Sequence, residues 1–169
     1  MRGYDGIEQL FGDAGVDHVY DDAGIGVGVN QSLAGQRLFG GDGIDYLYGY
    51  SFSTSLVNID SERLLPGDEM HGGAGGDWIY GSIRGELIYG DAGNETIEGD
   101  AIAGPSYAPF DMRALIGGND TIFGGSGEDK LYGGGGNDIL WGGEDSDWLE
   151  GQNGVDTMYG GSGIDIIHL

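Results

Sequence analysis

The sequence predicts an all-β solenoid built from nine-residue repeats. Residues 124–169 can be divided into five consecutive units, each with an Asp at its sixth place and an apolar residue at its eighth place. Glycines occupy most of the first, second and fourth places of these units. A fixed period of this kind outweighs any assignment of helix or strand made segment by segment.

Each unit is predicted to consist of a turn of six residues followed by a strand of three. Glycines at the first, second and fourth places permit positive φ and close approach of neighbouring backbones, which favours a tight turn. The last three residues have an aliphatic residue in the middle, whose side chain points to the face opposite those of its two neighbours, and this segment is too short for a helix. One unit cannot bury its apolar residue alone, so the units have to stack on one another.

Copies of the unit recur upstream in the same phase, for example GGDGIDYLY from Gly40 and GGAGGDWIY from Gly72. The sixth places at Gly26, Gln36 and Thr54 depart from the pattern, and one additional residue near Asn30 is needed to restore the phase. Two segments do not repeat, and insertions in solenoids form loops that can carry function. We therefore expect a single domain over residues 1–169, divided into degenerate repeats (1–48), a loop insertion (49–71), repeats (72–100), a loop insertion (101–114) and regular repeats (115–169).

Composition excludes several classes of protein. The net charge is -23, with 6 Lys and Arg against 29 Asp and Glu, so nucleic acid and anionic lipid surfaces would repel the chain. Cysteine is absent, which excludes disulfides and cysteine-based metal or redox sites. No apolar run is long enough for a membrane span, and the opening MRGYDGIEQL lacks the apolar stretch of a cleaved signal peptide.

Catalytic patterns are weak, and we expect no catalytic residues and no enzyme activity in this segment. The stretch GYSFS from Gly49 lacks the closing glycine of a nucleophile elbow, and there is no H-E-x-x-H sequence. Ninth places are rich in aromatic residues, and Phe123, Trp141 and Tyr159 are predicted to share one face. These rings could bind sugars or a partner domain, but aromatic residues also suit exposed strand faces, and we favour that interpretation.

The units GGSGEDKLY and GGDGIDYLY resemble the glycine-rich nonapeptide G-G-x-G-x-D-x-U-x of the repeats-in-toxin (RTX) proteins, a calcium-binding repeat. The resemblance implies a right-handed parallel β-roll in which two nonapeptides form one coil, so that units 18 residues apart stack. Asp17 would then have Gln36 as its nearest neighbour along the stack. The expected stacks are Asp129 with Asp147 and Asp165, Asp120 with Asp138 and Asp156, Asp77 with Glu95, and Asp68 with Glu86, and Asp45 is a further sixth-place residue.

The resemblance also implies several Ca²⁺ ions between the turns. Two carboxylates one strand spacing apart, about 4.8 Å, repel by roughly 3 kcal/mol at an effective dielectric of 20, and a cation between them reverses the sign. Ca²⁺ suits a turn of carboxylates and carbonyls better than Mg²⁺, which demands strict octahedral geometry. Glu86 and Glu95 could still bind with a longer side chain, whereas Gly26, Gln36 and Thr54 leave their places without a ligand. The carbonyl ligands implied by the family are those of Gly124, Ser126, Gly133, Gly135, Gly142, Glu144, Gly151 and Asn153.

The function implied is a calcium-binding module of a larger secreted bacterial protein, which folds outside the cell and leaves it by a type I route. Such chains carry an uncleaved C-terminal signal, and the ending IDIIHL has none, so we expect an internal module, and a monomer. Another part of the parent protein could be catalytic. Two alternatives are an adhesion or carbohydrate-binding module, with a polysaccharide or another domain of the parent as partner, and an enzyme-associated repeat module such as that of an alginate epimerase.

Overall fold

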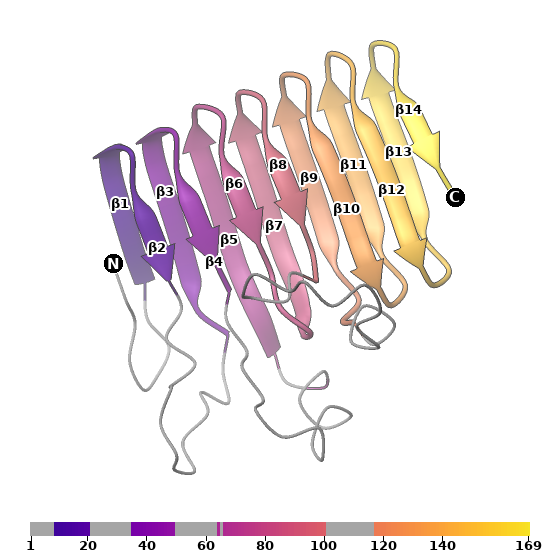
Figure 1. Cartoon of the computed structure of the whole chain (residues 1–169), viewed down its shortest axis with the longest axis horizontal. Coiled ribbons are helices and arrows are strands. Elements are labelled where there is room, and N and C mark those ends of the chain that lie inside the picture. Colours follow the sequence, from indigo (N-terminus) through magenta and orange to yellow (C-terminus); the bar gives the residue numbers. More distant parts are fainter. Residues whose placement is uncertain (1–8, 21–34, 50–63, 65, 101–116) are drawn as a thin grey trace, which may run out of the picture.

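The computed structural model describes residues 9–20, 35–49, 64, 66–100 and 117–169, and all regular structure in these ranges is β-strand. Two parallel sheets of seven strands face one another (Figure 1). Odd-numbered strands form one sheet and even-numbered strands the other, so the chain changes sheet at every turn. The predicted all-β parallel roll with two repeats per coil is therefore confirmed. Within the described ranges, no helix is long and apolar enough to cross a membrane.

Each sheet is a ladder of parallel strands in register. The first sheet contains, in spatial order, β1 (Gln9–Gly15), β3 (Arg37–Gly43), β5 (Pro66–Ala74), β7 (Gly85–Ala92), β9 (Thr121–Ser126), β11 (Ile139–Glu144) and β13 (Thr157–Ser162). The second contains β2 (His18–Tyr20), β4 (Tyr46–Tyr48), β6 (Trp78–Tyr80), β8 (Thr96–Glu98), β10 (Lys130–Gly135), β12 (Trp148–Asn153) and β14 (Ile166–His168).

The core is a double row of eighth-place side chains between the sheets. Each strand from β1 to β12 contributes one fully or almost fully buried residue: Leu10, Val19, Leu38, Leu47, Met70, Ile79, Ile88, Ile97, Ile122, Leu131, Leu140 and Leu149. Burying such a side chain stabilises the fold by about 1.5 to 3 kcal/mol. A repeat of nine residues therefore has only one large apolar side chain to hold it, and the polar turns have to contribute.

The turns are shorter than predicted. Strands β9 to β13 each run for six residues, because the first three places of a repeat continue the strand of the previous repeat. Only the fourth to sixth places form the turn. Gly127, at a fourth place, has φ +123°, and a Cβ there would collide with the carbonyl oxygen of Gly93 in the preceding coil. Glycine is required where stacked coils approach this closely.

The register shows where extra chain leaves the roll. Stacked sixth-place residues lie 18 residues apart in the regular part, but 28 apart at Asp17 and Asp45, 32 apart at Gln36 and Asp68, and 34 apart at Glu86 and Asp120. Asp17 and Asp45 are thus ten residues further apart than one regular coil requires (28 − 18), where we expected one extra residue near Asn30. Residues 21–34, between β2 and β3, lie outside the described residues, as does the predicted loop at 101–114.

The predicted loop at 49–71 is too long at its C-terminal end. Strand β5 begins at Pro66, so residues 66–71 belong to the first sheet. Met70 supplies the core residue of that strand and Asp68 occupies its sixth place. The sequence of this repeat departs from the nonapeptide pattern, so the strand was not predicted. Its core residue Met70 is in register with Leu38 and Ile88.

Candidate metal centre

Sixth-place side chains line up along the two edges where the sheets meet, forming two columns. The first column contains Asp17, Asp45, Asp77, Glu95, Asp129, Asp147 and Asp165. The second column contains Gln36, Asp68, Glu86, Asp120, Asp138 and Asp156. Most of these residues directly precede the strand of their repeat, and Asp68 and Glu86 lie inside β5 and β7, so the parallel register fixes their positions.

Hydrogen bonds connect the residues of a column. The backbone N–H of Asp129 donates to Oδ1 of Asp147 at 2.9 Å, and the N–H of Asp147 donates to Oδ1 of Asp165 at 3.1 Å. The second column repeats the pattern, with 2.9 Å from Asp120 N to Asp138 Oδ1 and 2.9 Å from Asp138 N to Asp156 Oδ1. These are the stacks that the 18-residue spacing predicts.

Near the N-terminus the stacking differs from our expectation. Asp17 does not lie beside Gln36; its N–H donates to Oδ1 of Asp45 at 2.9 Å. Gln36 belongs to the second column, and its N–H donates to Oδ1 of Asp68 at 2.7 Å. The expectation was wrong because β3, which follows Gln36, pairs with β1, so the two sheets are exchanged relative to a simple count of nine.

Except for Asp17 at the N-terminal end of its column, each aspartate of a column accepts a ladder hydrogen bond at one carboxylate oxygen, and its other oxygen takes no part in the ladder. Among the described residues, the Oδ2 atoms of six aspartates are buried without a hydrogen-bond partner: Asp45, Asp77, Asp120, Asp129, Asp138 and Asp147. Buried polar atoms are nearly always paired. The same atom is unpaired in six aspartates, which therefore indicates that these oxygens bind a cation.

The first-place glycines show where that ligand fits. A Cβ on Gly124 would collide with Asp129 Oδ2 and with the carbonyl oxygen of Gly142 in the next coil. The same collision, with the aspartate of its own repeat and a carbonyl of the next coil, occurs at Gly133. The space beside each of these glycines is thus bordered by a carboxylate oxygen and a main-chain oxygen. Oxygen donors of both kinds are the ligands that Ca²⁺ prefers, so the residues present fit this ion.

Third-place carbonyls accept hydrogen bonds from the preceding coil. The carbonyl oxygen of Ser126 accepts from Gly93 N–H at 2.8 Å, and that of Asn153 accepts from Gly136 N–H at 2.8 Å. Carbonyl oxygens are among the ligands that Ca²⁺ uses. The first-place and third-place carbonyls named from the family resemblance remain predicted ligands, at strand positions that flank the turns with the carboxylates.

Burial raises the pKa of the column carboxyls, because the ionised form loses its hydration. It raises the pKa of Asp77, Asp138 and Asp147 to about 6. The pKa of Glu95 rises to about 9, through burial and then through the adjacent Asp129 carboxyl. Ionising these groups at neutral pH therefore costs free energy in the folded chain, unless a cation compensates their charge.

Basic side chains contribute little compensation. Among the described residues, Arg84 is the one basic group that lowers the pKa of a column carboxyl, that of Asp68, and burial still raises this pKa to about 6. The nearby Arg37 ion pair is with Glu69, which lies outside the columns. The columns thus present unbalanced negative charge along the length of the roll.

The two sixth-place glutamates keep their places in the columns. Glu86 N–H donates to Asp120 Oδ1 at 2.8 Å, while Glu86 Oε1 accepts from the Ser82 hydroxyl at 2.6 Å. Glu95 N–H donates to Asp129 Oδ1 at 3.0 Å, and both of its carboxylate oxygens are buried without a hydrogen-bond partner. The longer side chain therefore still delivers unpaired oxygens to the column.

The predicted aromatic face forms a continuous stack on the first sheet. Phe123 and Trp141 have ring centroids 6.3 Å apart, and Trp141 and Tyr159 4.0 Å apart, with interplanar angles of 16° and 19°. The stack continues through Tyr89 and His71 towards the N-terminus. Since the rings cover one another's faces, the row offers edges rather than open faces for sugar stacking. This geometry supports the interpretation that the aromatics cover the strand face.

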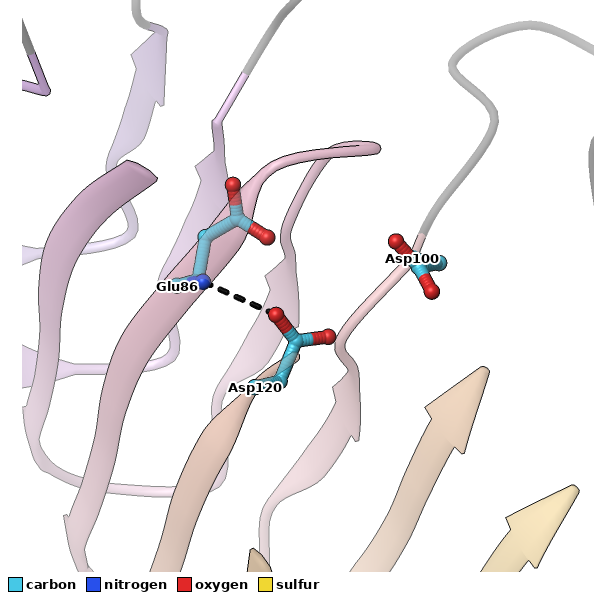
Figure 2. A group of neighbouring side chains, drawn as sticks. All are labelled: Glu86, Asp100 and Asp120. Carbon is cyan, nitrogen blue, oxygen red and sulfur yellow. Dashed lines mark hydrogen bonds between the residues drawn. The ribbon is translucent and has the colours of Figure 1, made fainter. Parts of the chain in front are cut away.

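Sequence reasoning missed Asp100. Its carboxylate lies with those of Glu86 and Asp120, and one ligand oxygen from each falls within 4.8 Å of the others (Figure 2). Asp100 stands at the second place of an interrupted repeat, directly before residues 101–116. The available signal was an Asp at the entrance of an insertion, but the same place also holds Asp13 and Asp91, which are exposed.

Two parallel sheets joined by short turns, with columns of unpaired oxygens at those turns, define a cation-binding β-solenoid. The family model for the RTX calcium-binding nonapeptide repeat, in four copies, matches residues 2–24, 35–51, 67–83, 71–101, 116–149 and 132–167. The chain therefore belongs to the RTX calcium-binding nonapeptide repeat family. It is a calcium-binding β-roll module, and such repeats are structural rather than catalytic and are typical of secreted proteins. Comparison with curated proteins and with solved structures gave no match.

Proposed function

We propose that this chain is a calcium-triggered folding module of a larger secreted bacterial protein. The observation that carries the proposal is the row of buried, unpartnered Oδ2 atoms along both columns. The module is unfolded where calcium is scarce and folds where calcium is abundant. Folding of the roll outside the cell then provides a stable scaffold for the rest of the secreted protein.

Several Ca²⁺ ions would be held between successive coils by carboxylates of one column and carbonyls of the adjoining turns. The regular repeats supply the most complete sites, because their first, third and sixth places are all present. The proposed carboxylate ligands are Asp120, Asp129, Asp138, Asp147, Asp156 and Asp165, with Asp45, Asp68, Asp77, Glu86 and Glu95 in the N-terminal coils. When bound, the cation supplies positive charge and completes the oxygen pairing of the turns.

Electrostatics explains why folding depends on the cation. Carboxylates on neighbouring coils, about 4.8 Å apart, repel by roughly 3 kcal/mol per pair at an effective dielectric of 20. The net folding stability of a domain is only about 5 to 15 kcal/mol, and each repeat of this roll has one large core side chain. A few bare pairs are therefore enough to unfold the roll at neutral pH.

Calcium levels outside cells suit such sites. A ligand that binds only the folded state stabilises it by RT ln(1 + [L]/Kd), which is about 1.4 kcal/mol per site at millimolar calcium and a Kd of about 10⁻⁴ M. Neighbouring sites share turns, so the folding transition should be steep in calcium concentration. The proposed route of export is type I secretion, in which an unfolded chain passes out of the cell and folds on arrival.

The test is far-ultraviolet circular dichroism of EDTA-stripped protein during a calcium titration, with magnesium as the control ion. We expect an unfolded spectrum in EDTA and a cooperative appearance of strand signal with calcium. Magnesium should induce far less signal at the same concentration. A strand spectrum already present in EDTA at neutral pH, or an equal response to magnesium, would contradict the proposal.

A further inference from the structure

The turn that precedes β9 is interrupted and differs from the regular turns. The chain leaves the second sheet after Glu98, passes through Gly99 and Asp100, and returns to the first sheet at β9. Gly99 occupies a first place, since a Cβ on it would collide with Asp120 Oδ2 and with the carbonyl oxygen of Gly133. Asp100 therefore occupies the second place, where most of the regular repeats have glycine.

The side chain of Asp100 is fixed in this turn by two backbone amides. Its Oδ1 accepts from Gly118 N–H at 3.1 Å, and its Oδ2 accepts from Gly135 N–H at 2.6 Å. Gly118 follows the insertion and Gly135 belongs to β10. The carboxylate, which precedes the insertion, is thus held by two amides that follow it.

Two further carboxylates approach the same point with buried atoms that lack partners. Glu86 is 2 % exposed and Asp120 1 % exposed, and Glu86 Oε2 and Asp120 Oδ2 have no hydrogen-bond partner among the described residues. One oxygen from each of these residues and one from Asp100 lie within 4.8 Å of each other (Figure 2). The unpaired atoms and the third carboxylate are independent observations, and both indicate a bound cation.

A second-place aspartate does not by itself produce this arrangement. Asp91 and Asp13 stand at the same place of uninterrupted turns, with φ +77° and +79°, and their side chains are exposed. Among the described residues, neither of them joins a group of three carboxylates. Asp100 differs from them in its surroundings, because its carboxylate lies beside those of Glu86 and Asp120 and accepts from the amides of Gly118 and Gly135.

We propose that Glu86, Asp100 and Asp120 form a divalent-cation site distinct from the regular turns, in which the residue before the 101–116 insertion becomes a ligand. The inference rests on the proposed calcium-dependent function and adds a residue that the repeat pattern does not supply. Three carboxylates give this site more negative charge than the pair from two stacked coils. Since affinity for Ca²⁺ rises with the charge of the ligand set, this site fills first and joins both ends of the insertion to the roll.

The experiment is isothermal titration of the EDTA-stripped full chain with Ca²⁺, comparing wild type with Asp100→Asn and with the matched control Asp91→Asn. Both substitutions remove one charge at a second place. We expect Asp100→Asn to weaken the tightest binding event by about tenfold or more, while Asp91→Asn leaves it unchanged. Glu86→Gln, which retains an oxygen to accept from Ser82, should weaken the same event, and combining it with Asp100→Asn should add little.

The outcomes separate this inference from the proposed function. A wild-type chain that binds no calcium overturns both. A wild-type chain that binds calcium, with an Asp100→Asn isotherm that superimposes on that of Asp91→Asn, overturns only the site, and Asp100 is then a cap for the amides of Gly118 and Gly135. Asp100→Asn cannot be interpreted if its dichroism in saturating calcium stays below that of the wild type. Glu86→Gln then decides, and a tightest calcium-binding event unchanged in this variant contradicts the proposal.

Discussion

Substituting Asp147 by Asn tests whether the columns act through charge. The amide keeps the shape of the side chain and one acceptor oxygen, so the hydrogen bond from Asp129 N–H can persist. The backbone N–H of residue 147 also remains free to donate to Asp165. The substitution therefore removes a charge from the middle of a column and leaves its hydrogen-bond ladder in place.

The expected effect has opposite signs with and without calcium. Burial, and then the charges of Asp129 and Asp165, raise the pKa of Asp147 from 3.8 to about 6. Without screening by water, this shift would oppose folding by about 3 kcal/mol at neutral pH. Little of Asp147 is accessible to solvent, but it lies in a thin turn at the edge of the roll, where few atoms surround it. Screening by water reduces this free energy, and we expect Asp147→Asn to stabilise the calcium-free roll by about 1.5 kcal/mol.

With calcium present, the loss is larger than that gain. Asp147 lies between two neighbours of its column and so borders two sites. Two sites at about 1.4 kcal/mol each amount to roughly 3 kcal/mol of stability at millimolar calcium. Asp147→Asn should therefore raise the calcium midpoint of folding in circular dichroism, and it should not decrease the strand signal in EDTA.

The matched control is Asp145→Asn, which removes the same charge from the same turn. Asp145 is exposed and has φ +73°, a conformation that Asn tolerates. We expect its calcium midpoint to lie close to that of the wild type. Equal shifts for the two variants, or destabilisation by Asp147→Asn in EDTA as well as in calcium, would refute the reasoning.

Two further predictions concern protons and the first-place glycines. Because folding raises the pKa of Asp77 and Asp138 to about 6, the calcium-free roll is most stable at low pH and loses this stability as the pH rises through 6. EDTA-stripped protein should therefore gain strand dichroism when the pH falls from about 8 to about 5, and identical spectra at the two values would contradict this. Gly133→Ala places a Cβ against Asp138 Oδ2 and should raise the calcium midpoint of folding. Gly76→Ala should change this midpoint little, because its Cβ would approach only the Asn94 carbonyl, whose oxygen lies at 3.2 Å. Equal midpoints for the two variants would show that the space beside Gly133 is not a ligand site.

The sequence predicts the repeating part of this structure well, because a strict period leaves one choice of inward side chain per strand. Leu131 and Leu140 follow the same rule as Leu47 far upstream, and all three are fully buried. The sixth-place aspartates follow from the same period. Turn length was overestimated, since glycines such as Gly125 lie in paired strands despite their turn propensity.

The order of stacking across an insertion could not be predicted from the period. Counting in nines places Asp17 next to Gln36, but Asp17 is paired with Asp45, 28 residues further along the chain. The choice depends on which aliphatic residue completes the core, here Leu38 beside Leu10. Asp100 was missed for a related reason, because the nine-residue period does not predict that its carboxylate lies near that of Glu86.

The aromatic stack gives the folded roll an optical signature. Trp141 lies between Phe123 and Tyr159, and these three residues belong to β9, β11 and β13 of successive coils. Their rings come together only when three coils are in register. Excitation of the tyrosine should pass to the tryptophan in the assembled roll and not in the extended chain, so the intrinsic emission of Trp141 reports coil-on-coil assembly without any attached label.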